Sequence, residues 1–70
     1  MTNFSKRLIE LRKLNGYSQL TISESTKISI RYYQDLEYSK KEPTLSKLIA
    51  LADFFNVSLD YLVGRSDNLN

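Results

Sequence analysis

The sequence predicts a small all-α domain built from five short helices. One local pattern occurs four times: an apolar residue, a Ser or Thr, three residues and a second apolar residue. A hydroxyl at that position accepts a hydrogen bond from the free N–H groups of a first helical turn, and the apolar pair closes over the turn. No segment shows the alternation of apolar and polar residues that is typical of a strand. The four instances start at Tyr17-Ser18, Ile28-Ser29, Pro43-Thr44 and Val57-Ser58.

The five helices are assigned in chain order. We expect the first over residues 3–15, because Phe4, Leu8 and Leu11 recur at helical spacing and Gly16 follows as a C-terminal cap. The four capped starts predict helices over residues 18–26, 29–38, 44–55 and 58–63. The domain is expected over residues 1–64, followed by a polar tail over residues 65–70. The predicted core comprises Leu8, Leu11, Tyr17, Ile22, Ile28, Tyr33, Leu36, Leu45, Leu48, Leu51, Ala52, Phe55, Val57 and Leu62.

The connection between the second and third expected helices is unusually short. Only two or three residues around Lys27 and Ile28 separate them, which forces a sharp bend. This is the geometry of a helix-turn-helix, whose second helix can enter the major groove of DNA. A short helical hairpin that serves packing alone would have the same spacing, so the spacing leaves both interpretations open.

Charge is distributed unevenly along the chain. The net charge is +2, but residues 1–47 contain nine Lys/Arg and five Asp/Glu, whereas residues 48–70 contain one and three. A polyanion would therefore be attracted to the first two-thirds of the chain, although a solvated charged surface would have the same composition.

Composition argues against several classes of protein. The chain contains no His and no Cys, so the usual general base, nucleophile and soft metal ligands are missing. Its carboxylates are scattered singly, and we therefore expect no enzyme activity, no metal and no cofactor. The longest apolar run, residues 48–52, is far shorter than the roughly 20 residues that span a bilayer. A cytoplasmic protein without a membrane segment is expected.

An ordered set of residues resembles the lambda-type repressor and Cro regulators, the XRE-type helix-turn-helix proteins. The resemblance covers nearly the whole chain. It implies a five-helix, phage-repressor-like DNA-binding domain with the helix-turn-helix in its second and third helices, acting as a sequence-specific transcriptional regulator. The matching residues are Leu8, Leu11, Arg12, Gly16, Ser18, Gln19, Ile22-Ser23, Ile28-Ser29, Glu37, Pro43-Thr44-Leu45 and Val57-Ser58-Leu59-Asp60-Tyr61-Leu62-Val63-Gly64.

Two positions depart from the family pattern. Such proteins usually carry glycine where Lys27 and Ser39 stand. Glycine adopts a left-handed backbone freely, whereas a residue with a Cβ pays about 1 kcal/mol or more for it. Either the chain accepts this strain or the two turns are built differently.

The candidate base-reading residues lie on the outward side of the third helix. Spacing from Ile28 turns Tyr33 and Leu36 inward, and the resemblance implies base reading by Ile30, Arg31, Gln34 and Asp35. Arginine pairs with guanine, glutamine with adenine, and an isoleucine suits a thymine methyl group. The aspartate has two open interpretations: it accepts from cytosine, or it pairs with the arginine four residues earlier.

The candidate phosphate contacts lie at helix ends. The resemblance implies Ser18 and Gln19, at a helix N-terminus whose free N–H groups and dipole favour an anion. Ser29 is assigned the corresponding place before the third helix, where it also caps. Tyr38, Lys40 and Lys41 follow that helix and form a candidate phosphate-binding loop, with solvated lysines as the alternative.

The remaining implied residues concern folding and assembly. The resemblance implies a structural salt bridge between Arg12 and Glu37, and a dimer contact that includes Leu59 and Tyr61. The expected partner is double-stranded DNA with an inverted-repeat operator, bound by a protein that dimerises weakly when free. The alternative is a helical protein-interaction module on the same fold, such as an antitoxin or antirepressor-type partner.

Overall fold

The computed structural model describes residues 3–68 and contains five helices. The all-α prediction is confirmed: residues 3–68 include no strand, and every helix boundary lies within one residue of its predicted position. The expected tail is described only as far as residue 68. No helix in this part of the chain is long and apolar enough to cross a membrane. The helices are α1 (Asn3–Leu14), α2 (Gln19–Thr26), α3 (Ile30–Glu37), α4 (Leu45–Phe55) and α5 (Leu59–Leu62).

Each helix after α1 begins at a hydroxyl residue that caps it. The Ser18, Ser29 and Ser58 hydroxyls accept hydrogen bonds from the backbone N–H three residues ahead, at 3.0, 3.1 and 3.0 Å. Thr44 makes the same contact at 3.4 Å. These bonds satisfy N–H groups that have no partner inside the helix. The four predicted caps are confirmed.

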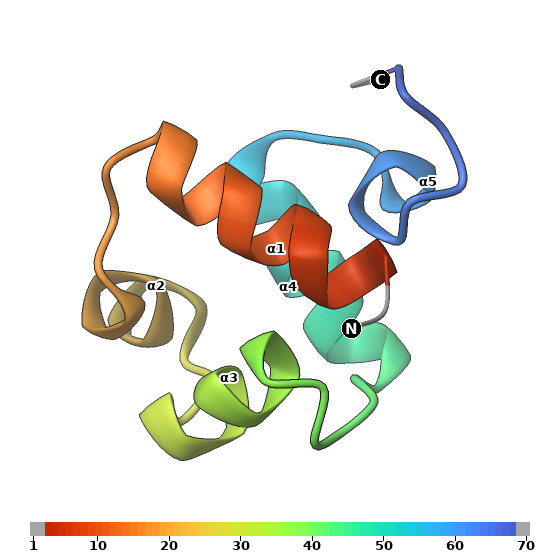
Figure 1. Cartoon of the computed structure of the whole chain (residues 1–70). Helices are drawn as coiled ribbons and strands as arrows, with labels where there is room; N and C mark the ends of the chain where they lie inside the picture. Colours follow the sequence, from red (N-terminus) through yellow and green to blue (C-terminus); the bar gives the residue numbers. More distant parts are fainter. Residues whose placement is uncertain (1–2, 69–70) are drawn as a thin grey trace.

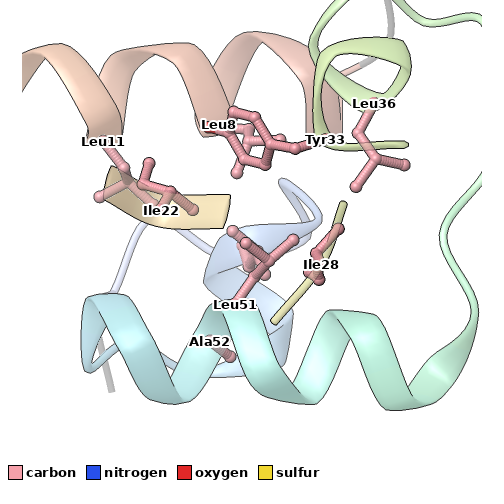
Figure 2. Packing of buried hydrophobic residues seen from close by; sticks show 9 residues of the cluster. Leu8, Leu11, Ile22, Ile28, Tyr33, Leu36, Leu51 and Ala52 are labelled. Carbon is pink, nitrogen blue, oxygen red and sulfur yellow. The ribbon is translucent and has the colours of Figure 1, made fainter. Parts of the chain in front are cut away.

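The helices pack around a single core (Figure 1). α2 packs against α3 and α4, α1 packs against α3 and α5, and α4 packs against α5. The helix pair α2 and α3 lies at one end of the molecule and α5 at the other. Figure 2 shows Leu8 and Leu11 pointing from α1 toward Leu51 on α4. The buried apolar residues are Leu8, Leu11, Ile22, Ile28, Tyr33, Leu36, Leu51, Ala52 and Leu62, with Leu48, Phe55 and Val57 partly buried against them.

Two members of the predicted core are wrong. Leu45 is 66% exposed, because it is the first residue of α4 and a helical side chain leans toward the N-terminus, here beyond the helix end. Tyr17 is 36% exposed: its ring packs at the edge of the core against Phe54 and Phe55, with ring centroids 5.1 and 6.3 Å apart.

Several polar side chains are buried where helices meet. The Ser5 hydroxyl donates to the Leu36 carbonyl at 2.8 Å and accepts from the Ser39 hydroxyl at 2.7 Å. Ser23 donates to the Ile28 carbonyl. The Ser23 bond supplies a partner for the Ile28 carbonyl just before α3, and the Ser5 bond adds to the one that the Leu36 carbonyl accepts from the Ser39 N–H at the end of α3. The small Ser23 thereby fixes the turn between α2 and α3.

Candidate nucleic-acid interface

The turn between α2 and α3 is tightly specified. α2 ends at Thr26, and Lys27 follows in the left-handed region with φ 63°. The Thr26 hydroxyl donates to the Ile22 carbonyl at 2.7 Å, and Ile28 is 3% exposed in the core. The chain therefore accepts the strain that the missing glycine implied. Ser39, after α3, also has a positive φ, of 60°.

The structure places the four candidate base-reading residues on the outer side of α3. Ile30 and Arg31 are exposed, and the Arg31 side chain is 86% exposed. Gln34 and Asp35 are half-buried. The opposite side of the helix is closed, because Tyr33, Leu36 and Glu37 are buried. One side of α3 is thus fixed inside the fold, and the other offers hydrogen-bonding groups to a partner.

Arg31 and Asp35 lie close enough to pair. Their Nε and Oδ1 atoms are 3.9 Å apart, one helical turn from each other. The guanidinium remains largely in solvent, where such a pair contributes only about 0.3–0.5 kcal/mol. This contact is weak enough for Arg31 to exchange it for a stronger partner.

A chain of hydrogen bonds crosses the inner side of α3 and links three helices. Arg12, on α1, donates to both carboxylate oxygens of Glu37, at 2.6 Å from Nε and 3.1 Å from Nη2. Gln19, the first residue of α2, donates to Glu37 at 2.9 Å. Gln34 Nε2 in turn donates to the side-chain oxygen Oε1 of Gln19 at 3.1 Å. These hydrogen bonds therefore connect the buried ion pair to Gln34, a candidate base-reading residue.

Glu37 remains charged although its side chain is only 2% exposed. Burial alone raises the pKa of this carboxyl, but the interactions with Arg12, Tyr33 and Gln19 outweigh burial and lower the pKa below its ordinary value. The Tyr33 hydroxyl is buried and has no partner within hydrogen-bonding geometry among residues 3–68. Burial, followed by the neighbouring carboxylate, raises the pKa of Tyr33 and keeps this phenol neutral.

The candidate phosphate contacts differ in how free their side chains are. Tyr38, Lys40 and Lys41 are exposed in the loop after α3. Ser18 and Ser29 are exposed, but their hydroxyls already cap α2 and α3. The Gln19 amide is engaged at both its nitrogen and its oxygen. Ser18 and Gln19 still offer their backbone N–H groups to a phosphate at the N-terminus of α2, where the helix dipole also favours an anion.

Sequence reasoning missed two features of this surface. The first is the internal role of Gln19, which no local pattern could signal because its partners lie 15 and 18 residues away. The second is Lys47, on the first turn of α4. Its ammonium group lies 4.9 Å from the centre of the Tyr32 ring on α3. A single lysine near a helix start carries no signal of such a contact in the sequence.

The two candidate dimer residues have different surroundings. Leu59, the first residue of α5, is 38% exposed. Tyr61 is half-buried, and the guanidinium of Arg7 lies 4.0 Å from its ring centre. Arg7 also approaches Asp67 at 3.4 Å, which joins α1 to the segment after α5. Leu59 is therefore the more available of the two.

Comparison with known proteins identifies the family. The Helix-turn-helix family matches residues 8–62, which cover the five-helix fold apart from the first five residues of α1. The uncharacterized HTH-type transcriptional regulator YobD of Bacillus subtilis is 34% identical over 65 residues, or 93% of this chain. The HTH-type transcriptional regulator ImmR of the same organism is 32% identical over 65 residues. The cryptic phage CTXphi transcriptional repressor RstR of Vibrio cholerae is 32% identical over 60 residues, or 86% of the chain.

These relatives are longer than this chain. The matched segments cover 58%, 51% and 54% of YobD, ImmR and RstR, so the chain spans about half the length of the curated relatives it matches. No solved structure matches the chain significantly. The family match, the four capped helices and the fixed turn between α2 and α3 lead to one conclusion. The chain belongs to the XRE-type helix-turn-helix family of DNA-binding transcriptional regulators.

Proposed function

We propose that this chain binds double-stranded DNA in a sequence-specific manner and regulates transcription as a repressor-like protein, with α3 in the major groove. The observation that carries the proposal is the two-sided character of α3. Its inner side is held by the core and by the Glu37 hydrogen bonds, while Arg31 extends 86% exposed from its outer side. A rigid helix with an exposed, planar, five-donor side chain suits recognition of base edges.

Each outer residue is assigned a type of base contact. Arg31 would donate to the O6 and N7 atoms of guanine, exchanging its weak contact with Asp35 for two hydrogen bonds. Gln34 is held by Gln19 through one amide hydrogen, which leaves the second hydrogen and the carbonyl oxygen for adenine. Ile30 suits a thymine methyl group. Asp35 then positions Arg31 or accepts from cytosine.

The backbone contacts flank this helix. The N-terminus of α2 at Ser18 and Gln19 and the N-cap of α3 at Ser29 would bind phosphates through N–H groups. Tyr38, Lys40 and Lys41 would bind phosphates from the loop after α3. Such contacts hold the protein in register on the duplex and carry no sequence information themselves.

The proposed operator is an inverted repeat bound by two copies. One reading helix contacts too few base pairs to distinguish a site among the roughly 10⁶ competitors in a genome, and a two-fold dimer doubles the information. We place the contact between copies at α5, around the exposed Leu59 and the neighbouring Tyr61. So small a surface buries little area, so the free protein would dimerise weakly and bind DNA cooperatively.

A salt titration on a random duplex tests the proposal. Fluorescence anisotropy should detect binding at 50 mM salt, and affinity should fall steeply by 200 mM, because each phosphate contact releases counterions. Absence of binding at 50 mM would contradict DNA binding as the function.

A protein-interaction module is the second candidate. It is favoured by Leu45 and Ile49, which are exposed one turn apart on α4 at 66% and 43%. Adjacent exposed apolar side chains are typical of a partner surface. The same titration separates the two functions, because a module of this kind would show no salt-sensitive affinity for DNA.

A further inference from the structure

One asparagine of the chain is followed directly by a glycine, at Asn15-Gly16. In such a pair the backbone nitrogen of the glycine can attack the side-chain carbonyl carbon of the asparagine, because glycine has no Cβ to hinder the approach. Both residues are exposed, and a Cβ added at Gly16 would meet no atom of the described residues within 4 Å beyond its chain neighbours. Water and the attacking nitrogen therefore have access to the asparagine side chain.

The folded C-terminus of α1 restrains both reacting groups. The side-chain Nδ2 of Asn15 donates to the Leu11 carbonyl at 2.8 Å, and the Gly16 N–H donates to the Lys13 carbonyl at 3.1 Å. Gly16 itself is held in the left-handed region, with φ 70°. The attacking nitrogen must lose its proton, and the leaving amide must turn away from Leu11. The last turn of α1 therefore has to open before the two groups can react.

The same turn is connected to α3 through Arg12. The Tyr17 N–H donates to the Arg12 carbonyl at 3.0 Å, and Nη1 of Arg12 donates back to the Tyr17 carbonyl at 3.4 Å. The rest of this guanidinium is bound to the buried Glu37 carboxylate. The ion pair that holds the inner side of α3 thus also closes the segment that contains Asn15 and Gly16. Losing the Glu37 carboxylate should make this segment open more often.

We propose that Asn15-Gly16 is a site of spontaneous deamidation, and that opening of the C-terminus of α1 sets its rate. The Gly16 nitrogen forms a bond to Cγ of Asn15, the Cγ–Nδ2 bond breaks, and the proton lost by the Gly16 nitrogen leaves with the amide as ammonia. One water molecule then opens the five-membered imide at either carbonyl and gives aspartate or isoaspartate. Water is the only co-reactant, and the inference does not depend on the proposed function.

The product should weaken the cap in which it forms. A carboxylate at position 15 has no hydrogen to donate to the Leu11 carbonyl, and it places a negative charge at a helix C-terminus, where the dipole disfavours it. It also lies three residues after Arg12, within reach of the guanidinium that Glu37 holds. Deamidation should therefore loosen the attachment of α1 to α3, and the change is irreversible.

The test follows the mass of the peptide that contains Asn15 while the full chain stands in mildly alkaline buffer, with and without urea. In urea Asn15 should convert to the acid about tenfold faster or more, as an opening free energy of about 1.4 kcal/mol gives. A short peptide of residues 13–18 in both buffers corrects for any effect of urea on the chemistry. Asn56 is the internal control, because the β-branched Val57 follows it, and its mass should not change.

Two variants test the link to α3 and the effect of the product. Glu37→Gln, shown to be folded by circular dichroism, should deamidate about threefold faster or more than the parent without urea, the factor that loss of one hydrogen bond gives. In urea the two rates should be equal. Asn15→Asp should melt about 4–8 °C below the parent. Asn15→Gln, whose longer side chain cannot close a five-membered ring, should show no mass change.

Each part of the inference can fail separately. No conversion of Asn15 in urea would overturn the deamidation site. Equal rates with and without urea would overturn control by the C-terminus of α1, and equal rates of the folded parent and Glu37→Gln would overturn the role of the ion pair. An Asn15→Asp protein that melts with the parent would overturn the effect of the product. None of these measurements involves DNA, so they leave the proposed function untouched.

Discussion

Both sides of α3 carry charged side chains, but the charge on the inner side is buried and paired, whereas that on the outer side is exposed. On the inner side, Glu37 is 2% exposed, and three hydrogen bonds from Arg12 and Gln19 satisfy its carboxylate. On the outer side, Arg31 is 86% exposed and has one distant partner, Asp35. A buried charge must be paired because its desolvation is costly, whereas an exposed charge keeps its water until a ligand replaces it. The inner side therefore fixes the helix, and the outer side stays available for binding.

Removing the inner charge should have the largest effect. Glu37→Ala leaves Arg12 without its carboxylate and releases Gln19. Breaking a buried pair costs about 3–5 kcal/mol. Because Arg12 is partly exposed, we expect the free energy of unfolding to fall by about 3 kcal/mol. For a domain of this size the melting temperature should fall by more than about 10 °C. Glu24→Ala, which removes an exposed carboxylate on α2, is the matched control. A Glu37→Ala protein that melts within two degrees of the parent would contradict a buried, structural pair.

Protonating the Glu37 carboxylate should also destabilise the protein, but by less than its removal. The pKa of Glu37 in the folded protein lies below its ordinary value of 4.5, so the unfolded state binds the proton first. The contribution of Glu37 to stability is complete above pH 4.5 and is lost as the pH falls through the folded pKa. Melting curves from pH 7 to pH 3 should show this loss, and Glu37→Gln should show less of it. If the parent and Glu37→Gln lost stability identically at low pH, protonation of Glu37 would not be the cause of that loss.

Changing the outer side should alter recognition and leave stability intact. Arg31→Ala should weaken binding to the preferred duplex by about 1–3 kcal/mol and relax the preference at one base pair of each half-site. Lys40→Ala should instead weaken binding to all duplexes alike and lower the salt slope by about 0.9. Isotherms on duplexes with single base-pair changes measure both effects. The reverse pattern would remove Arg31 from the reading residues and leave Gln34 as the leading one.

Glycine substitutions in the two left-handed turns that flank α3, at Lys27 and Ser39, should have the smallest effect on stability. Lys27→Gly relieves the strained backbone at φ 63° and should stabilise the protein by up to about 1 kcal/mol, reduced by the freedom of glycine in the unfolded chain. Ser39→Gly should give less or nothing, because it also removes the hydrogen bond from Ser39 to Ser5. Urea denaturation of both variants measures the difference. Equal gains would mean that the Ser39–Ser5 bond contributes no net stability.

The fold was predictable because its signals are local. Ser18, Ser29, Thr44 and Ser58 each cap a helix through an N–H only three residues away, so the pattern can be read within one short segment. The strain at Lys27 was only one of two alternatives that the sequence left open. The family pattern, in which glycine occupies that turn, limited the outcome to two alternatives, a strained left-handed backbone or a different turn, and the structure shows the left-handed backbone.

The remaining features depend on contacts between distant segments. Gln19 looks like a phosphate contact in the sequence, and its bonds to Glu37 and Gln34 exist only once α2 and α3 are packed. Leu45 has core spacing, but it is the first residue of α4 and its side chain is exposed. Lys47 gains its place beside Tyr32 through the fold of the loop before α4. Exposure and long-range pairing are set by the tertiary arrangement, which helical periodicity does not encode.

Selection of bound duplexes from a random pool tests most directly whether the exposed side of α3 reads DNA. The parent protein should enrich an inverted repeat whose half-sites lie roughly 34 Å apart, one turn of duplex. The same selection with Arg31→Ala should lose the preference at one position of each half-site and keep the rest. An enriched sequence with a single half-site, saturated by one protein, would contradict dimeric binding but not base reading by α3. Binding without enrichment of any sequence would contradict the central claim that α3 reads bases.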